Sequence, residues 1–163
     1  MISINALSVL FRAAADQHPM VNQYGIGQVY NISADAATTY PLLWVVPDGG
    51  DMGEEVYTHR FTMYLIDRMK EDFSNEVEVL SDTHQVLTDV LTVMYDWSQD
   101  KEYTMQWGGT FSPIVDEQAD IVAGHSVQVS FEVFHGKDSC AIPGAYIEPD
   151  VLTTDEGDYL LWT

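Results

Sequence analysis

The sequence predicts an α+β domain: a mostly antiparallel sheet with one central helix and an N-terminal helix packed on it, and with extended arms. Three observations predict this class. Between Asp82 and Trp97, apolar residues recur at three- and four-residue steps, the spacing of a helix with one apolar face. An N-terminal stretch repeats that spacing, and segments that alternate polar and apolar residues, as half-buried strands do, lie on both sides of the central helix.

The first predicted element is a helix over Ser3–Gln17, whose start Ser3 or Asn5 can cap. Pro19 ends it, because proline disfavours helical geometry in the residue before it. Gly25 and Gly27 are predicted bends, and Gln28–Ile32 is a predicted short strand.

The middle of the chain contains the longest predicted strand. Leu42–Val46, an apolar run between two prolines, suits a short buried strand, and Asp48–Gly53 reads as a turn-rich loop. Glu55–Met69 alternates over a length of about 50 Å, beyond the usual strand, so we expect another subunit to cover part of it. The central helix is predicted to start at Asp82, which has the spacing of a capping box with Gln85.

Two further strands are predicted after the central helix. The first is Tyr103–Trp107, which Gly108–Gly109 ends, and Thr110–Ala119 is a predicted loop. Ile121–His135 has apolar residues at two-residue spacing, interrupted by His125, and its Gln128 and Ser130 are predicted to face out. A bulge or bend is expected at Gly124. Together with Glu55–Met69, this strand is predicted to form the spine of the sheet and to offer edges to neighbouring copies. Residues 1–144 then form one domain, and 145–163 an acidic and apolar C-terminal arm.

Charge is the extreme feature of the composition. Twenty-six acidic residues face six Lys and Arg, a net charge of −20 among 163 residues of which 46% are hydrophobic. Adhesive DNA binding is disfavoured, because affinity for phosphates rests on Lys and Arg. Self-repulsion for solubility, a halophilic source, and a surface past which DNA slides all fit this balance. No apolar run reaches the length of a membrane span, no secretory leader is recognisable, and Cys140 has no cysteine to pair with.

No motif for catalysis, metal binding or a cofactor emerges. The five histidines form no zinc pattern, and the glycines of Asp48–Gly53 lack the lysine of a P-loop. Carboxylate pairs such as Glu76 with Glu78 occur because acids are abundant. The sequence therefore predicts a protein that is not an enzyme and that has no catalytic residue, metal or cofactor.

Two blocks carry a family resemblance: YTHRFTMYLIDRMKEDFSNEVEVLSDTHQVLTDVLTVMYDW and FSPIVDEQADIVAGHSVQVSFEVFHGKDSCAIP. They resemble small virion proteins of tailed bacteriophages that join head to tail or terminate the tail, over roughly residues 1–143. The resemblance implies a tail-terminator-like subunit of a homo-oligomeric ring, commonly of six copies. Such a ring sits between the portal or neck proteins and the tail tube protein, and DNA passes through it without specific binding. It implies a location in the virion tail or neck, after assembly in the bacterial host cytoplasm, and no membrane.

Two sets of residues follow from this hypothesis. The predicted contacts with sister subunits or partners are Tyr57, Arg60, Tyr64, Trp107, Phe111, Tyr159, Leu161 and Trp162. The acids predicted to line the lumen are Asp48, Asp51, Glu54 and Glu55, which could also hold a cation loosely. Two other classes stay open. One is a small carboxylate-dependent hydrolase, which needs a cleft with two acids and a histidine. The other is an acidic DNA mimic or protein-binding module.

Overall fold

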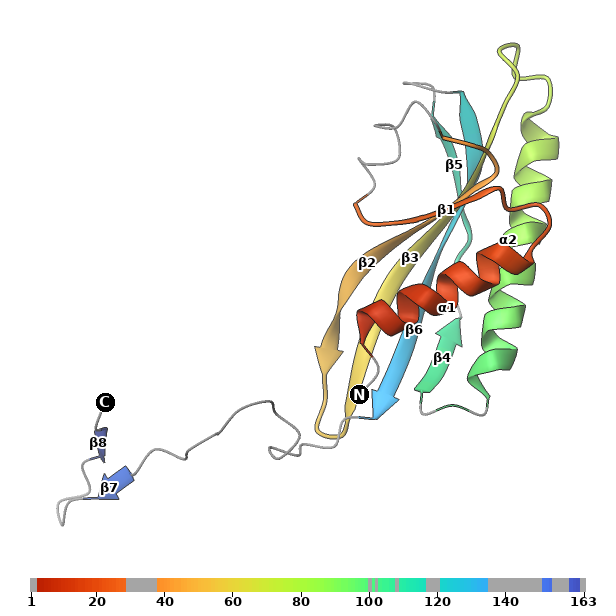
Figure 1. The fold of residues 1–163 in the computed structure, drawn as a ribbon. Coiled ribbons are helices and arrows are strands. Elements are labelled where there is room, and N and C mark those ends of the chain that lie inside the picture. The colour runs from red at the N-terminus through yellow and green to blue at the C-terminus, as the bar shows by residue number, and fades with distance from the viewer. Residues whose placement is uncertain are drawn as a thin grey trace.

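The computed structural model shows an α+β fold in which two helices lie on one side of a six-stranded, mostly antiparallel sheet, in the described part of the chain (Figure 1). The described residues are 3–28, 38–99, 101, 103–107, 109–116 and 121–134, with the backbone of 151–153 and 159–161. The strands run in the order β1-β2-β3-β6-β4, and β5 pairs with β6 beside β4. The coarse fold class predicted from the sequence is thus confirmed.

Helix α1 spans Ile4–Gln17, as its spacing predicts. Ser3 caps it by accepting a hydrogen bond from the backbone N–H of Ala6 at 3.2 Å. Leu7 and Phe11 point into the core with almost no exposed surface. The helix therefore forms where the sequence places it, because cap, apolar stripe and proline all agree.

The first observed strand was not predicted from the sequence. Strand β1 covers Gln23–Ile26 and pairs in parallel with β2, whereas 29–32 lie outside the described residues. Gly25 is therefore a strand residue and not a bend. The Trp44 ring lies against it, since a Cβ at that position would be 2.1 Å from the ring.

Strand β2 runs from Leu42 to Met52, so the predicted loop after the second proline is wrong. The strand continues because a bulge between Pro47 and Gly49 absorbs one extra residue, Asp48, and pairing with β3 then resumes. Gly49 has a φ of +90°, a backbone conformation that favours glycine. The glycines thus mark a bulge, which sequence reading confused with a turn.

Strands β3 (Val56–Arg68) and β6 (Val122–Phe134) form the spine, and they pair antiparallel over 13 positions. This confirms both strands and their role at the centre of the sheet. The expectation that they offer edges is wrong, because β3 also pairs with β2, and β6 also pairs with β4 and β5. Of the bulge or bend expected at Gly124, the bulge does not occur, since the β3–β6 register has no shift there. A Cβ on Gly124 would be 1.9 Å from the Leu65 carbonyl oxygen, so the glycine permits a close approach of two strands.

Helix α2 spans Glu76–Ser98 and begins six residues before its predicted start. Asp82 therefore lies inside the helix and is not its cap. The apolar stripe extends backward through Val79 and the buried Thr83, whose hydroxyl donates to the Val79 carbonyl at 2.8 Å. Glu76 and Glu78 in the true first turn interact favourably with the helix dipole. Acidic residues at this position are a weaker sequence signal of a helix start than a capping box.

Two short strands, β4 and β5, pair with the same edge of β6. Strand β4 covers Tyr103–Trp107 as predicted, and β5 covers Ser112–Asp116 where a loop was expected. Both run antiparallel to β6, so the segment between them is an interruption in one line of pairing. The glycines at this interruption and Pro113 concealed the second strand from sequence reading.

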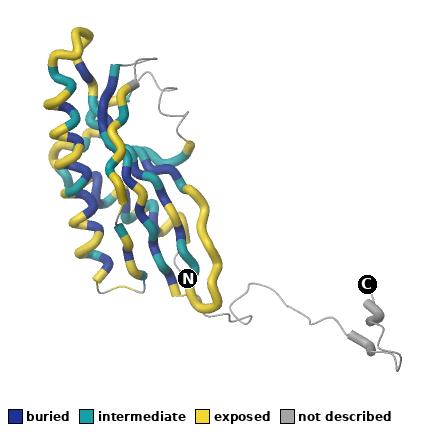
Figure 2. The backbone as a smooth tube through the Cα atoms, turned by 180° about the vertical axis from the view of Figure 1, so that it is seen from behind, coloured by how far each residue is buried: buried dark blue, intermediate teal, exposed yellow. Residues whose placement is uncertain are grey.

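The core lies between the helices and one face of the sheet. Phe11, Phe61 and Phe131 meet there edge to face, with ring centroids 5.0 to 5.9 Å apart. Figure 2 shows buried residues along the strands and the inner side of α2, and exposed ones along the outer side of α2 and around the β2–β3 hairpin. None of the described helices has the length and apolar character needed to cross a bilayer.

Two short strands occur in the C-terminal arm, where the sequence shows little periodicity. Strands β7 (Val151–Thr153) and β8 (Tyr159–Leu161) pair antiparallel with each other.

Candidate interaction surface

The sheet has one face that the helices do not cover, here called the open face. Its polar part consists of β3, β6, β4 and β5 side chains that alternate with the core residues: Thr58, Arg60, Thr62, Tyr64, Thr104, Gln106, Ser112, Ser126, Gln128, Ser130 and Glu132. Strand pairing brings them into rows, such as Gln106 beside Ser130 and Ser130 beside Arg60. None of these side chains belongs to the buried class. Farther along the same side of β3 and β6, Ile66 and Val122 are buried.

Hydroxyl and amide groups dominate the open face. Gln106 Nε2 donates a hydrogen bond to Glu132 Oε1 at 2.7 Å. At the β2 side, Thr62 donates to Asp48, and Arg60 forms an ion pair with Asp51. The bulge in β2 makes both contacts possible, because it turns the two acids toward β3.

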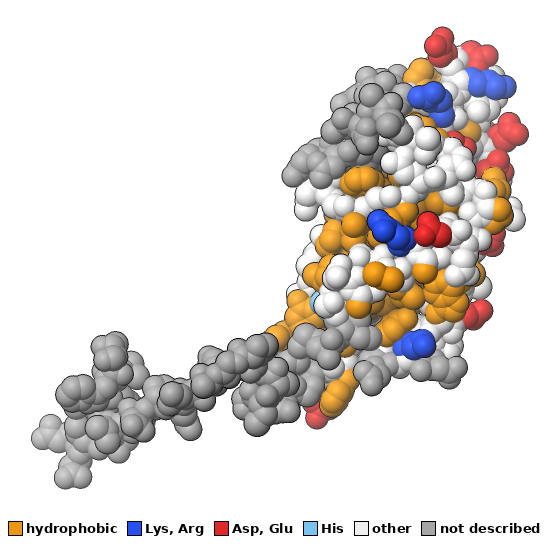
Figure 3. Space-filling model, in the orientation of Figure 1, with side chains coloured by type: hydrophobic (Ala, Val, Ile, Leu, Met, Phe, Trp, Pro, Cys, Tyr) orange, Lys and Arg blue, Asp and Glu red, His pale blue; other side chains and the backbone are white. Residues whose placement is uncertain are grey.

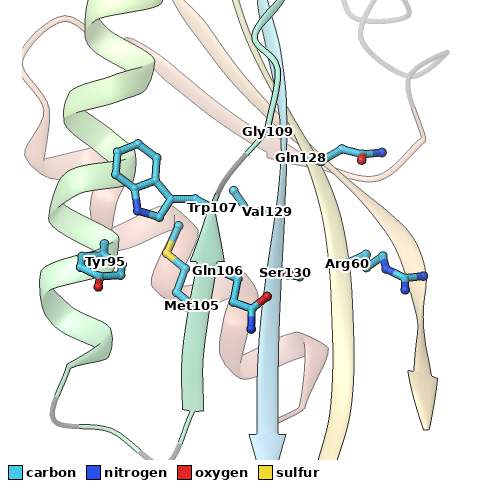
Figure 4. A pocket seen from close by; sticks show the side chains of 9 residues that line it. All are labelled: Arg60, Tyr95, Met105, Gln106, Trp107, Gly109, Gln128, Val129 and Ser130. Carbon is cyan, nitrogen blue, oxygen red and sulfur yellow. The ribbon is translucent and has the colours of Figure 1, made fainter. Parts of the chain in front are cut away.

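Two hollows meet on this face. The larger, of about 590 Å³, extends from Arg60, Gln128 and Ser130 past Gln106 to Trp107 at the β4 margin (Figure 4). The smaller, of about 400 Å³, lies toward β5, and its described lining includes Thr62, Tyr64 and Ser126. They share Gly109 and Gln128, so together they form one groove where the chain leaves β4. No carboxylate occurs among the described residues that line either hollow.

The open face ends in an apolar pair. Val56 and Phe134 are register partners on β3 and β6, and they follow the polar rows on the same face. Phe134 is 65% exposed and Val56 is 37% exposed. Large apolar side chains at such exposure are suited to contact with another surface.

Acidic side chains, which are absent from the described lining of the groove, are concentrated along α2. Residues 71–99 hold seven acids and no Lys or Arg: Glu71, Asp72, Glu76, Glu78, Asp82, Asp89 and Asp96. Figure 3 shows acidic side chains along the side of the molecule where α2 lies. Asp82, Asp89 and Asp96 recur every seven residues and form a stripe, in which Asp89 Oδ2 lies 3.6 Å from His18 Nε2.

A pair of histidines joins α2 to the sheet. The rings of His84 and His125 are 5.4 Å apart, and Phe111 lies 4.5 Å from the His84 ring. Thr83 Oγ1 is 3.2 Å from His125 Nδ1. Burial, and then the positive charge of His84, lowers the pKa of His125 below its usual range.

One acid near the same helix is also perturbed. Burial and the charge of Asp82 raise the pKa of Asp67, against a hydrogen bond from the Arg68 backbone N–H. Asp67 lines a separate hollow of about 560 Å³ with Asn22 and Arg68, and no histidine is among the described residues that line it. No cluster of metal-ligating side chains is found among the residues that the structure describes.

The predicted contact residues occupy different places. Arg60 and Tyr64 lie on the open face, whereas Tyr57 points to the helix side, 4.4 Å from the His59 ring. Trp107 packs 6.3 Å from Tyr95 of α2, and Phe111 packs on the two histidines. Tyr159 and Leu161 lie in β8, but their side chains, and all of Trp162, fall outside the described residues.

The four predicted lumen acids gather at the β2–β3 hairpin. Asp48, Asp51, Glu54 and Glu55 are all exposed. Two of them, Asp48 and Asp51, already contact Thr62 and Arg60.

Sequence reading missed the groove. Alternation placed Gln128 and Ser130 on the outward side of their strand, and this is confirmed. Their meeting with Gln106 depends on the β4–β6 pairing, which alternation within one strand does not reveal. The interruption after Trp107 was the available signal, since breaks in edge pairing often border hollows.

Comparison with known proteins returned no relative. A search against protein-family models found no match to this chain, and a search of curated proteins found no match either.

Proposed function

We propose that this chain is a structural subunit of a homo-oligomeric ring at the head–tail junction of a tailed bacteriophage, as a tail terminator or neck connector. The proposal starts from the two sequence blocks that resemble that family. The six-stranded α+β architecture is compatible with such a subunit in general terms. The ring would act by assembly with sister copies, portal or neck proteins and the tail tube protein.

The observation that carries the proposal is the open face. Antiparallel sheets commonly leave one face to water, so exposure alone says little. This face differs because it ends in exposed Val56 and Phe134 and contains a groove whose described lining has no carboxylate. Apolar anchors beside neutral polar groups are typical of a surface that contacts another protein.

The charge supports a role beside DNA without adhesion. Affinity for phosphates rests on Lys and Arg, and the chain has six against 26 acids. The exposed acids of the β2–β3 hairpin, Asp48 to Glu55, would repel a passing duplex if they faced the lumen. Such a ring would let DNA through without holding it.

Mass photometry tests this proposal. The purified chain is measured over a range of concentrations and salt, alone and with candidate neck and tube proteins. The expected result is a discrete species of fixed copy number, and negative-stain images of that species should show a ring. A monomer under all of these conditions contradicts the proposal.

An acidic protein-binding module is the second candidate, and the α2 stripe favours it. Seven residues of helix rise about 10 Å, whereas successive phosphates of one DNA strand advance about 3.4 Å along the duplex axis, so Asp82, Asp89 and Asp96 are spaced more widely along their axis. A basic protein surface fits the stripe better than mimicry of DNA. Replacing the three with asparagine should abolish co-purification of a basic partner from host lysate, and unchanged recovery would exclude this function.

A further inference from the structure

We propose that the open face, with its groove and its Val56–Phe134 end, is where a second copy of this chain docks. The inference rests on the proposed ring and names the surface through which its subunits touch. The occupant is a sister copy, and three features of the described residues point to it.

The first feature is charge. Two copies that each carry a net charge of −20 repel each other, and contact is least costly where the fewest acids face the neighbour. The α2 side concentrates seven acids without a Lys or Arg in 71–99. On the open face, by contrast, Arg60 is the one residue charged at neutral pH among the described lining of the groove.

The second feature is the chemistry of the groove. The larger hollow combines two amides, Gln106 and Gln128, with the hydroxyl of Ser130 (Figure 4). The smaller hollow adds the hydroxyls of Thr62 and Tyr64. Such groups donate and accept hydrogen bonds without the desolvation cost of a charge. The two hollows have volumes of about 590 and 400 Å³, which is enough room for side chains of a neighbouring subunit.

The third feature is the apolar end. Phe134 and Val56 lie side by side on the same face as the groove. A buried aromatic anchor next to neutral polar contacts is the usual composition of a contact that carries binding energy.

Other occupants fit less well. Nucleic acid needs several cations, and the groove offers Arg60 alone, which Asp51 already neutralises. A basic protein would be attracted to the α2 stripe before this face. A sister copy, in contrast, needs a surface low in negative charge, which the described lining of the groove provides.

The test introduces one negative charge at the centre of the face. Gln128→Glu keeps the size of an exposed side chain, so the fold should be retained. The matched control is Gln85→Glu, the same change at an exposed position of α2. Mass photometry should show roughly a tenfold rise in the concentration needed for assembly of Gln128→Glu, less at high salt, and little change for Gln85→Glu.

A footprint gives a second measurement at the same two positions. In a Cys140→Ser background, Gln128→Cys and Gln85→Cys are each labelled with a maleimide in dilute and in assembled samples. Assembly should slow labelling at position 128 and leave position 85 unchanged.

The outcomes separate the two proposals. A chain that assembles normally with Gln128→Glu, or whose thiol at 128 stays reactive in the assembly, overturns the open face as the contact and leaves the ring intact. A wild-type chain that stays monomeric throughout overturns both.

Discussion

The two faces of one sheet differ more than any other regions of this molecule. The helix-covered face of β3 and β6 contributes residues such as Phe61, Met63, Val129 and Phe131, each at most 2% exposed. The open face of the same strands contributes Thr62, Gln128 and Ser130, which remain partly or fully exposed. Because side chains alternate along a strand, neighbouring residues such as Phe61 and Thr62 lie on opposite faces of the sheet.

The two faces contribute to different properties: the covered face to folding stability, and the open face to contact with other molecules. Burial of apolar surface stabilises the fold by roughly 25 cal/mol per Å², so the covered face carries most of the folding free energy. The open face contributes little of it, and its residues can change with small effect on the fold. Substitutions on the open face should instead change the affinity of the protein for its binding partners.

The largest expected effect is on the covered face. Phe131→Ala removes the ring that packs against Phe11 and Phe61, at centroid distances of 5.6 and 5.9 Å. The free energy of unfolding should fall by about 3–5 kcal/mol, measured by urea denaturation. The adjacent change Ser130→Ala, on the open face, should alter it by less than about 0.5 kcal/mol. Equal losses at both positions would contradict the distinction between the faces.

A smaller effect is expected where the two spine strands come close. Gly124→Ala places a Cβ against the Leu65 carbonyl oxygen, and backbone has to move to make room. We expect a loss of about 1–3 kcal/mol in the same measurement. The control is Gly109→Ala, at which the nearest atom to a new Cβ is 3.5 Å away. A neutral Gly124→Ala would show that β3 and β6 are not packed this closely in solution.

The smallest expected effect concerns pH on the covered face. Because burial lowers the pKa of His125, the unfolded chain binds a proton that the folded chain resists. The contribution of His125 to stability is therefore complete above the ordinary pKa of about 6.5, and is lost as pH falls toward the folded pKa.

Urea midpoints at about pH 7.5 and about pH 5.5 measure this. The wild-type chain should lose more stability between them than His125→Asn, which cannot take up the proton. Other groups, among them Asp67 with its raised pKa, are common to both proteins and cancel in the difference. Identical losses in the two proteins would contradict the prediction.

Sequence reading was most reliable where several local signals agreed. Helix α1 has a serine cap, an apolar stripe and a terminating proline, and β6 alternates from Val127 to Phe134, so both were located to within a residue or two. It failed where a local signal had two meanings. Asp82 and Gln85 have capping-box spacing inside a helix, and the glycines after Pro47 belong to a bulged strand. In each case tertiary packing selected between conformations that the local sequence allowed.

By itself, the sequence determined the α+β class, the two spine strands, the apolar stripe of α2 and the strong negative charge. These depend on composition and on periods of two and 3.6 residues, which short stretches of chain contain in full. Only the tertiary structure decided that Gln106, Gln128, Ser130 and Arg60 share a groove, and that Phe134 stands beside Val56. Strand pairing between distant segments fixes these neighbours, and no periodicity within one segment encodes which strand lies next to it.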